Sequence, residues 1–240
     1  MARYNCFTGK IIDILDEATN IKRFFVQIAE LEKYDFKAGQ YVRLDLPVTY
    51  KKGIRYYSIA NAPNDTNIIE LLIVLDPNGQ ATNYLFNECT VGTEIRLSEP
   101  MGKFVVKEPI DKELCFICTG VGLAPFRSMI NDIYHREIPH KGIHLVFGTR
   151  YIGDLVYYNE FKNLEREFKD FHYHTTLSRE NSPDWQGNNG YVHKVFTDLY
   201  SDRRDANFYI CGYKDMITEA RQNLHELGYT KDQINFEKFD

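Results

Sequence analysis

A glycine-rich segment in the second half of the chain has the residue types and spacing of a phosphate-binding turn. The segment is Thr119-Gly-Val-Gly-Leu-Ala-Pro125, and it lies between an apolar stretch and a predicted helix. Glycines at such a turn let backbone N–H groups approach a phosphate, and the helix N-terminus adds a partial positive charge. Pro125 suits the first helical turn, and it occupies the place of the third glycine in the usual dinucleotide fingerprint. A tight turn without a ligand is the alternative, but the strand–turn–helix context favours nucleotide binding.

A second segment whose residue types are suited to binding a ligand is Arg55-Tyr-Tyr-Ser58, which follows a turn at Gly53. In a strand, alternation places Arg55 and Tyr57 on one face and Tyr56 and Ser58 on the other. A guanidinium can pair with a pyrophosphate, a tyrosine ring can cover a flat heterocycle, and a serine hydroxyl can hydrogen-bond a ring nitrogen. Taken alone, such a tetrapeptide is more often an ordinary edge strand.

The elements that must position these segments change in kind near residue 108. Before it, short runs alternate apolar and polar residues and are separated by turn residues, with one short helical candidate at Ala81–Asn87. The predicted strands are Thr8–Ile14, Ile21–Ala29, Gln40–Leu46, Arg55–Ala60, Ile68–Leu75 and Glu94–Ser98. This pattern predicts a small antiparallel β-barrel domain over residues 1–108.

From residue 109 to residue 240 the pattern becomes strand then helix, repeatedly. The predicted strands are Leu114–Thr119, Ile143–Gly148, Phe171–Ser178 and Asn207–Cys211, with a short last strand at Ile234–Phe239. The predicted helices are Ala124–Arg136, Asp154–Phe168, Tyr191–Tyr200 and Lys214–Leu227. The alternation predicts an α/β domain with a doubly wound parallel sheet, whose ligands bind outside the carboxyl ends of the strands.

The composition is that of an ordinary globular protein. The chain has 240 residues, of which 43% are hydrophobic and 26% charged, and its net charge of −5 argues against a general nucleic-acid binder. The longest apolar runs, such as Leu114–Cys118 and Leu71–Leu75, are far below the roughly 18 residues that span a bilayer. Residues 1–10 have no apolar stretch typical of a secretory signal, so we expect a cytoplasmic location and no membrane association. The 17 tyrosines and 16 phenylalanines are expected mostly in the core, with some facing a flat ligand.

The cysteines and histidines do not indicate a metal centre or a disulfide framework. The five cysteines are an odd number and widely spaced, and no four of them cluster as an iron–sulfur centre requires. Cys115 and Cys118 lie in one predicted strand, where residues three apart point to opposite faces. Of the seven histidines, only His172 and His174 are expected to share a strand face. We therefore predict no metal site and no iron–sulfur cluster in this chain.

Together these segments resemble the ferredoxin–NADP reductase superfamily of flavoproteins, and the resemblance covers nearly the whole chain. The motifs that carry it occur in the family's order: Phe36-Lys-Ala-Gly-Gln-Tyr41, Arg55-Tyr-Tyr-Ser58, Gly79-Gln-Ala-Thr82, Thr119 to Pro125, Phe147-Gly-Thr-Arg150 with Asp154-Leu, and Cys211-Gly-Tyr-Lys-Asp-Met216. Two positions depart from the pattern, since Thr82 stands where serine is commoner and Val121 replaces the usual threonine.

The resemblance implies FAD on the barrel domain, a reduced nicotinamide nucleotide on the α/β domain, and hydride transfer between them. It implies that Arg55 binds the FAD pyrophosphate, Tyr57 stacks on the isoalloxazine, Ser58 hydrogen-bonds flavin N5, and Cys211 lies near the nicotinamide. The implied catalytic residues are Ser58, Cys211, Glu237 and Phe239. The implied cofactor-binding residues are Arg55, Tyr56, Tyr57, Ser58, Ile73, Val74, Gly79, Gln80, Ala81, Thr82, Thr119, Gly120, Gly122, Pro125, Arg150, Ser178, Arg179, Tyr191, Cys211, Gly212, Met216 and Phe239.

The last residues, Phe236-Glu-Lys-Phe-Asp240, resemble the Glu-x-Tyr ending of the ferredoxin- and flavodoxin-NADP reductases. The resemblance implies that the C-terminal strand reaches the flavin and that Phe239 covers its other face. A terminal strand with an ordinarily packed phenylalanine is the alternative.

The choice of nucleotide depends on Leu177-Ser-Arg-Glu180, which is similar to the family's Ser-Arg pair for the adenosine 2′-phosphate. Arg179 would give a charge-assisted bond to a phosphate that NADH lacks, and Tyr191 could stack nearby. We expect NADPH in preference to NADH, although Ser-Arg also occurs in relatives that use NADH.

The resemblance implies ferredoxin or flavodoxin as the electron-transfer partner, and therefore a ferredoxin- or flavodoxin-NADP reductase activity. A flavin reductase, or the reductase component of a hydroxylase or oxygenase, is the alternative enzyme. A flavin-binding interaction module without turnover is a third class. Lys51, Lys52 and Arg55 form a basic stretch that could steer an acidic carrier or simply be a solvated turn.

Overall fold

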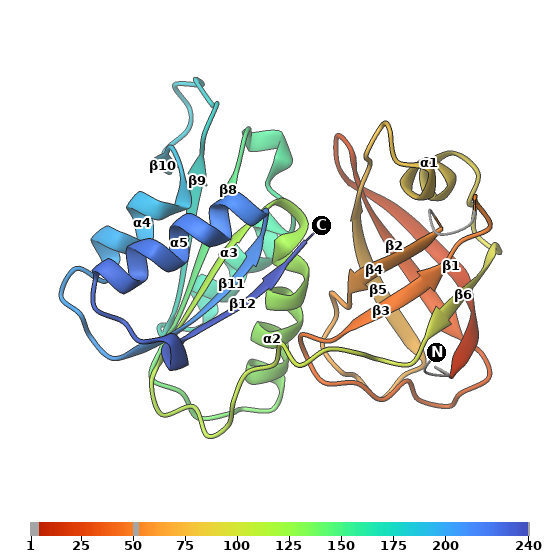
Figure 1. The fold of residues 1–240 in the computed structure, drawn as a ribbon, viewed down its shortest axis with the longest axis horizontal. Coiled ribbons are helices and arrows are strands. Elements are labelled where there is room, and N and C mark those ends of the chain that lie inside the picture. The colour runs from red at the N-terminus through yellow and green to blue at the C-terminus, as the bar shows by residue number, and fades with distance from the viewer. Residues whose placement is uncertain (1–4, 50–52, 240) are drawn as a thin grey trace. The chain divides into compact units, whose positions relative to one another are not determined.

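The computed structural model describes residues 5–49 and 53–239, and its internal contacts divide the chain into two compact units (Figure 1). The first unit comprises Met1–Val106 and Ala124–Glu137, and the second comprises Lys107–Leu123 and Ile138–Asp240. The helix after the glycine-rich turn therefore packs mainly with residues of the first unit. The predicted domain boundary between residues 108 and 109 stays a prediction. The grouping of this helix depends on contacts between residues far apart in the chain.

The first unit is an antiparallel β-barrel, as predicted. Its strands are β1 (Cys6–Ala18), β2 (Ile21–Ile28), β3 (Tyr41–Asp45), β4 (Ile54–Ser58), β5 (Ile68–Val74) and β6 (Glu94–Ser98). They form a sheet in the order β4-β3-β6-β1-β2-β5. An antiparallel bridge between Ile59 and Leu71, together with the 2.8 Å bond from Ala60 N to Glu70 O, joins the two outer strands. This pairing closes the sheet and leaves fewer free edges.

Alternation along the strands explains the barrel core. Val42 and Leu44 alternate with more exposed residues of β3 and are fully buried, and Phe24, Val26 and Ile28 do the same on β2. Each such side chain contributes roughly 1.5–3 kcal/mol by leaving water. The short helix α1 (Gln80–Asn87) adds Ala81 and Leu85 to this cluster.

Helix α2 (Leu123–His135) follows the glycine-rich turn, and its residues from Ala124 onward belong to the first unit. Phe126, Met129, Ile130 and Ile133 are buried at helical spacing and give it one apolar face. Phe126 packs against Phe104, with ring centroids 5.8 Å apart.

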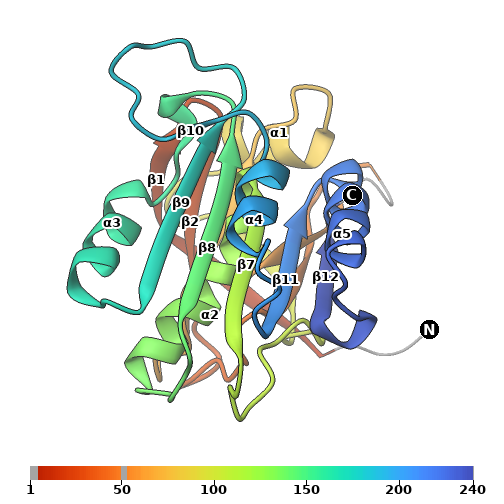
Figure 2. The same cartoon turned by 90° about the vertical axis from the view of Figure 1, so that its left-hand side faces the viewer.

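The second unit contains a parallel six-stranded sheet in the order β10-β9-β8-β7-β11-β12 (Figure 2). Its strands are β7 (Glu113–Thr119), β8 (Ile143–Thr149), β9 (Phe171–Leu177), β10 (Asn188–Asn189), β11 (Ala206–Gly212) and β12 (Ile234–Lys238). The helices are α3 (Tyr158–Glu167), α4 (Val192–Leu199) and α5 (Lys214–Glu226), with the 3₁₀ turns η1 (Gly120–Gly122), η2 (Ile152–Asp154) and η3 (Lys231–Gln233). The predicted strands and helices are all present, whereas β10 and the 3₁₀ turns were not predicted because they are too short to show a periodicity.

The two faces of this sheet have different helical cover. On one face, Cys115, Ile117 and Val146 join a buried cluster with residues of α4 and α5. On the other, Phe161 of α3 packs against Phe171, with ring centroids 6.1 Å apart. The sheet is therefore buried on both sides, as its near-continuous apolar strands predict.

Cys115 and Cys118 lie in one strand, β7, as the sequence predicts. Cys115 lies in the cluster under α4 and α5, while Cys118 is three residues further along the same strand and faces the opposite side. Both thiols are free and buried. Within residues 5–49 and 53–239, no helix has the length and apolar character needed to cross a bilayer. The cytoplasmic location stays a prediction.

Candidate cofactor sites

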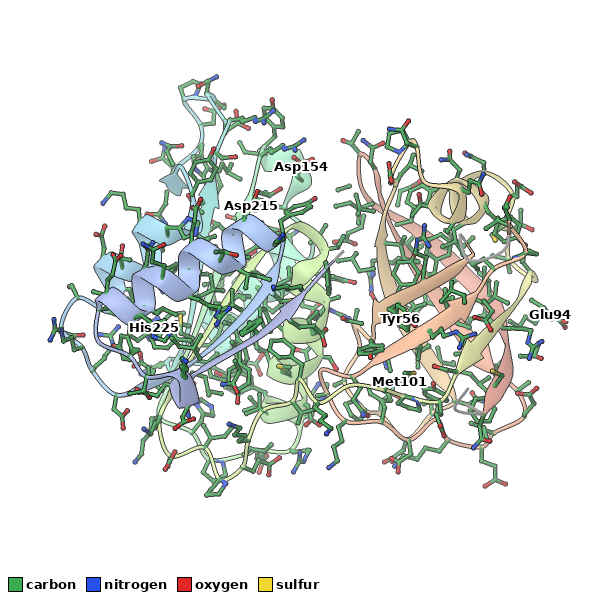
Figure 3. The ribbon with its side chains drawn as sticks, viewed as in Figure 1. Tyr56, Glu94, Met101, Asp154, Asp215 and His225 are labelled. Carbon is green, nitrogen blue, oxygen red and sulfur yellow. The ribbon has the colours of Figure 1, made fainter. Side chains whose placement is uncertain are left out.

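Strand β4 carries Arg55, Tyr56, Tyr57 and Ser58 with the alternation expected from sequence. Residues directly opposite each other in an antiparallel pair share a face, and Tyr57 lies opposite the fully buried Val42. The Tyr57 ring accordingly packs against the barrel core. Tyr56 is on the other face, 59% exposed, and meets the Tyr41 ring edge-on at 5.7 Å (Figure 3).

Two hydroxyl groups at the end of β4 are buried without a hydrogen bond to any described residue. They are Tyr57 Oη and Ser58 Oγ, and Ser58 is only 4% exposed. Burial raises the pKa of Tyr57 to about 12, although Arg55 opposes the shift, so Tyr57 keeps its proton at neutral pH. An unpaired buried polar group costs about 1–3 kcal/mol. Two of them on adjacent residues fit a site whose bound group completes their hydrogen bonds. Arg55 is half-buried, and its Nη1 donates to the neighbouring Ile54 O at 2.7 Å.

The loop before α1 is held by its own side chains. Thr82 Oγ1 donates to Asp76 O at 2.9 Å and accepts from Asp76 N at 3.1 Å, which closes the loop over the helix N-terminus. A Cβ atom added at Gly79 would lie 2.9 Å from Asp76 Oδ2, so the backbone runs close to that carboxylate. Gln80 is exposed at the start of the helix, and Ala81 is buried beneath it. The Thr82 hydroxyl is therefore used within the protein. The N-terminus of a helix is suited to binding a phosphate, and this role of the loop stays a prediction. Of the two β5 positions expected to bind cofactor, Ile73 is buried and Val74 is half-buried.

The glycine-rich turn adopts the 3₁₀ turn η1 between β7 and α2. Gly120 has φ +54°, in the left-handed region, and no described atom lies within 4 Å of where its Cβ would be. Gly122 is in the opposite situation, because its Cβ would lie 2.5 Å from Cys211 O. Thr119 Oγ1 is buried with no hydrogen bond from the described residues. The turn thus combines an open backbone position, a close approach to β11 and an unsatisfied hydroxyl. Pro125 is buried in the first turn of α2.

The carboxyl end of β11 gathers several of the predicted residues of the second unit. A Cβ at Gly212 would lie 2.5 Å from Thr119 Oγ1 and 2.9 Å from the end of the Met216 side chain. Cys211 is fully buried, and burial raises the pKa of its thiol well above the usual value. Cys211 pairs with Glu237 across β11 and β12. A backbone bond of 3.2 Å from Phe239 N to Gly212 O continues this pairing beyond the strand.

The loops after β8 and β9 are joined by backbone hydrogen bonds. Ser178 N donates to Thr149 O at 3.0 Å, and Arg179 N donates to Arg150 O at 3.1 Å. The structure therefore brings together Arg150, Ser178 and Arg179, and it leaves both arginine side chains exposed. Tyr191 is 73% exposed at the start of α4.

Glu180 is a charged neighbour that the sequence analysis did not assign. Its carboxylate accepts backbone N–H groups from Ser182 at 2.8 Å, Asn181 at 2.9 Å and Ile152 at 3.0 Å. These bonds hold the pKa of Glu180 below its usual range, with the bond from Ile152 contributing most. A fixed negative charge therefore follows Arg179 directly. Asp154, labelled in Figure 3, orders the same region by accepting from Tyr151 N at 3.2 Å.

The histidine prediction was incomplete, because a third histidine joins the expected pair. His144 is directly opposite His172 in the register of β8 and β9, and its Nδ1 lies 3.0 Å from His174 Nε2. Its Nε2 lies 3.5 Å from a carboxylate oxygen of Glu113. Burial, followed by the charges of the other histidines, lowers the pKa of His144 to about 3. The sequence signal was available, since His144 and His172 each occupy the second place in consecutive predicted strands.

Within the part of the chain that the structure describes, no group of three or more histidine, cysteine, aspartate or glutamate residues is arranged to hold a metal ion. Lys51 and Lys52, which were expected to form a basic stretch with Arg55, lie outside the described residues. The partner-steering role of that stretch stays a prediction.

Two models of known protein families match this chain. The model for an oxidoreductase FAD-binding domain matches residues 9–106, and the model for an oxidoreductase NAD-binding domain matches residues 116–222. The two matched regions include β4 and the glycine-rich turn, where buried hydroxyl groups have no hydrogen-bond partner among the described residues.

Several curated proteins are similar to this chain over most of its length. The anthranilate 1,2-dioxygenase electron transfer component of Acinetobacter baylyi is 32% identical over 95% of this chain, and the phenol hydroxylase P5 protein of Acinetobacter pittii is 30% identical over 97%. The chain spans only 65% of the length of each of these relatives.

Solved structures show the same fold. The cytochrome P450 reductase of Amycolatopsis matches all of this chain with a TM-score of 0.89 and 25% identity, and the chain covers 72% of it. A ferredoxin NADP+ reductase from Neisseria gonorrhoeae, solved with bound FAD and NADP, matches 98% of this chain with a TM-score of 0.83 and 23% identity, and the chain covers 99% of it.

Proposed function

The chain belongs to the ferredoxin–NADP reductase superfamily of flavoprotein oxidoreductases, and on this premise we propose that it passes electrons from NAD(P)H through FAD to a separate acceptor. When bound, FAD supplies the redox chemistry, because a flavin accepts two electrons as a hydride and releases electrons singly. The observation that carries the proposal is the pair of buried, unpartnered hydroxyls on Tyr57 and Ser58 within the Arg55–Ser58 segment.

In this proposal the protein's own residues bind and orient the FAD. Arg55 neutralises the pyrophosphate of FAD, Tyr57 covers the ring system, and Ser58 donates a hydrogen bond to it. Because Tyr57 keeps its proton at neutral pH, it acts as a hydrogen-bond donor rather than as a base.

The residues of the glycine-rich turn and of the end of β11 serve the nicotinamide nucleotide in the same proposal. The backbone N–H groups at Gly120 and Gly122 bind its phosphates, and Thr119 Oγ1 offers a further hydrogen bond. The buried Cys211 thiol stays protonated, which makes it a neutral neighbour of a nicotinamide ring rather than a nucleophile.

The test compares Ser58→Ala with Ser98→Ala. Both serines are buried in the first unit, but Ser98 Oγ is already used, since it accepts from Arg43 N at 3.0 Å and donates to Glu99 O at 2.7 Å. Ser98→Ala should lose about 1–3 kcal/mol of unfolding free energy and keep its turnover per folded molecule. Ser58→Ala should keep its stability, alter the visible spectrum of bound FAD and lower kcat about tenfold, the value of one hydrogen bond. If purified wild-type protein binds no flavin, or if Ser58→Ala changes neither spectrum nor kcat, this assignment is wrong.

For the nucleotide, we propose NADPH, on the strength of Arg179 beside Ser178. The fixed carboxylate of Glu180 opposes this preference, because it repels a 2′-phosphate. Arg179→Ala should lower kcat/KM for NADPH about tenfold or more and leave that for NADH almost unchanged, as the loss of a charge-assisted bond predicts. Glu180→Gln should shift the preference further toward NADPH. An unchanged ratio of the two efficiencies in Arg179→Ala would remove Arg179 from the argument.

For the acceptor, we propose a one-electron carrier such as ferredoxin or flavodoxin. The curated relatives named above are an electron transfer component of a dioxygenase and a protein of a phenol hydroxylase, and they favour an oxygenase system as the second candidate. Steady-state oxidation of NADPH and NADH with cytochrome c, with and without added ferredoxin or flavodoxin, separates these readings from reduction of free FMN or FAD. Stimulation by added ferredoxin or flavodoxin supports a one-electron carrier as the acceptor. Turnover with free flavin alone supports a flavin reductase. Bound flavin without turnover indicates an interaction module.

A further inference from the structure

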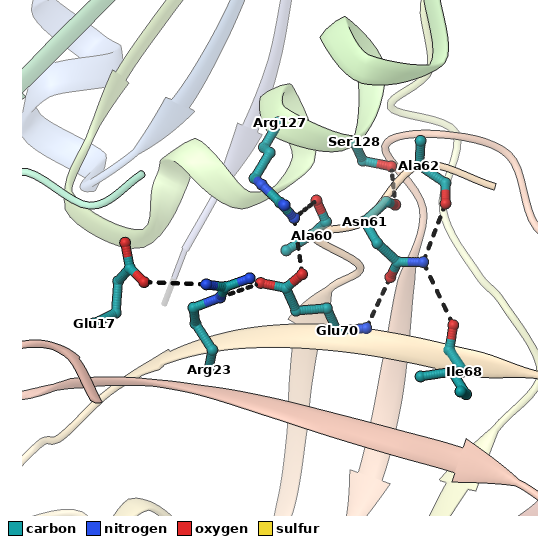
Figure 4. A network of polar contacts seen from close by, with 9 residues as sticks. All are labelled: Glu17, Arg23, Ala60, Asn61, Ala62, Ile68, Glu70, Arg127 and Ser128. Atoms are coloured by element: carbon teal, nitrogen blue, oxygen red, sulfur yellow. Dashed lines mark hydrogen bonds and ion pairs between the residues drawn. The ribbon is translucent and has the colours of Figure 1, made fainter. Parts of the chain in front are cut away.

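A buried carboxylate in the first unit is shared by two arginines from different elements (Figure 4). Glu70 of β5 has a side chain that is only 4% exposed. Its Oε1 accepts from Arg23 Nε of β2 at 2.6 Å, and its Oε2 accepts from Arg127 Nη1 of α2 at 2.9 Å. Each carboxylate oxygen therefore has its own guanidinium, and the two guanidiniums come from the barrel wall and from the helix.

The Arg127 guanidinium also contacts the segment that follows Ser58. Its Nη1 donates to Ala60 O at 3.0 Å, and the next residue, Ser128, donates from Oγ to Asn61 O at 2.7 Å. Two successive carbonyls after β4 are therefore bound by two successive residues of α2. Both hydrogen bonds join residues that are 67 positions apart in the sequence, so they fix tertiary structure rather than a local turn.

The same segment is held from the other side by β5. Ala60 N donates to Glu70 O at 2.8 Å, and Glu70 N donates to the Asn61 side-chain oxygen at 2.7 Å. Residues 59–61 are thus fixed between the barrel and α2, and Glu70 takes part on both sides through its backbone and its carboxylate. Ser58, whose unpartnered hydroxyl carries the proposed function, directly precedes this segment.

Stability alone does not account for the second arginine. A buried ion pair is weak evidence for stabilisation, since desolvation offsets much of the attraction, and such groups often serve to fix one arrangement. Arg23 already supplies one positive charge to Glu70 at short range. The feature that distinguishes Arg127 is that it connects the carboxylate and Ala60 O to a helix that continues without a break from the turn at Gly120–Gly122.

We propose that Arg127 and Ser128 are positioning residues that couple the Ser58 segment to the nicotinamide-nucleotide turn through α2. The proposal rests on the proposed function, in which Ser58 serves the flavin and the turn serves the nucleotide. Neither residue needs to contact substrate, because each acts by holding the start of α2 to the backbone after Ser58. Loss of either contact should weaken productive nucleotide binding while leaving the flavin in place.

The two arginines provide a matched test, since they pair with the same carboxylate but only Arg127 belongs to α2. Arg127→Met and Arg23→Met each remove one guanidinium from buried Glu70, so both should lower Tm. Only Arg127→Met and the milder Ser128→Ala should raise KM for the reduced nucleotide and the Kd of NADP+, by about 2- to 30-fold for a coupling of this kind. The Kd of FAD should stay within about twofold in all three variants. Arg127→Lys, which keeps the charge and a donor, should recover part of the loss.

Hydrogen exchange of the flavin-free protein gives a readout independent of turnover. The amides at the start of α2 should exchange faster in Arg127→Met and Ser128→Ala than in Arg23→Met. Equal KM increases in the two arginine variants, or an unchanged KM in Arg127→Met despite a lower Tm, would overturn the proposal. If Arg127→Met does not fold, Ser128→Ala and Arg127→Lys decide by the same criteria. A wild-type protein that neither binds FAD nor oxidises nucleotide refutes the proposed function instead, and the exchange data still report whether Arg127 anchors α2.

Discussion

The two glycines of the turn η1 should respond very differently to the same substitution. Gly122 approaches β11 so closely that an added Cβ would lie 2.5 Å from Cys211 O and 2.9 Å from Cys211 C. Both atoms are backbone, and β11 is held by hydrogen bonds between β7 and β12. Ordinary contact begins near 3.4 Å, so the turn and the strand must separate by about 0.9 Å (3.4 minus 2.5) to admit a methyl group. Gly120 has no such neighbour, but its φ of +54° is unfavourable for any residue with a Cβ.

The expected costs follow from these two mechanisms. Gly120→Ala should lose about 1 kcal/mol of unfolding free energy, the cost of one left-handed residue. Gly122→Ala should lose about 3 kcal/mol, at the upper end for overpacking, because no flexible side chain can move aside. The difference of about 2 kcal/mol corresponds to a Tm lower by about 4–8 °C in a chain of this size. Displacement of the turn should also weaken the binding of NADP+ and NAD+ in Gly122→Ala, where a shift near 1 Å can cost about 100-fold in turnover.

Urea unfolding and calorimetric titration with NADP+ measure both effects. Gly92→Ala is the control, because Gly92 also has a left-handed φ, +98°, and open space, but lies in the first unit outside the predicted motifs. It should match Gly120→Ala in stability and bind nucleotide normally. If Gly122→Ala is no less stable than Gly120→Ala, the close approach of the turn to β11 does not constrain this position and the reasoning fails.

Three further predictions use other parts of the structure. Because burial lowers the folded-state pKa of His144 to about 3 and also lowers that of His174, the unfolded chain binds more protons below its histidine pKa of about 6.5. The free energy of unfolding should therefore fall as pH drops from about 6.5 toward 3, by at most about 1.4 kcal/mol per pH unit for each proton. Urea unfolding between pH 7 and pH 4 should show a less steep fall for His144→Gln than for the wild type. Equal slopes would contradict the assignment. Iodoacetamide should modify Cys6 in the native protein, since Cys6 is exposed and the other four cysteines are buried, and mass spectrometry that finds Cys211 modified first would refute this. Truncation after Lys238 removes Phe239 and its bond to Gly212 O, and it should alter both NADPH binding and the flavin spectrum; no change in either rejects a stacking role for Phe239.

The periodicity of apolar residues made the strands and helices predictable, whereas contacts between distant segments could not be predicted from the sequence. Alternation located the strands because one face of each is buried, and it also gave the faces of β4, where Tyr57 lies opposite the buried Val42. The grouping of α2 with the barrel could not be read in this way, since helical periodicity shows that a face is buried but not against what.

The Glu70 network shows where a signal existed and where it ended. Glu70 is the single charge within Ile68–Val74, and a lone carboxylate in an apolar strand predicts a buried, paired group. The identity of its partners was not available from the sequence, because Arg23 and Arg127 lie 47 and 57 residues away. Local rules specify that a buried charge needs a partner, and only the fold specifies which one.

The hydroxyl groups left unsatisfied are the strongest link between the sequence motifs and function. Among the described residues, buried hydroxyls without partners occur at Tyr57, Ser58, Thr119, Tyr173 and Tyr200. The first three fall in the two segments that sequence alone marked as chemically capable, and they lie at the ends of β4 and β7. Ser98 and Thr82 are also buried, yet their hydroxyls have hydrogen-bond partners within the fold. Since folding normally satisfies such groups, a deficit concentrated at these strand ends is what a site completed by its ligand requires.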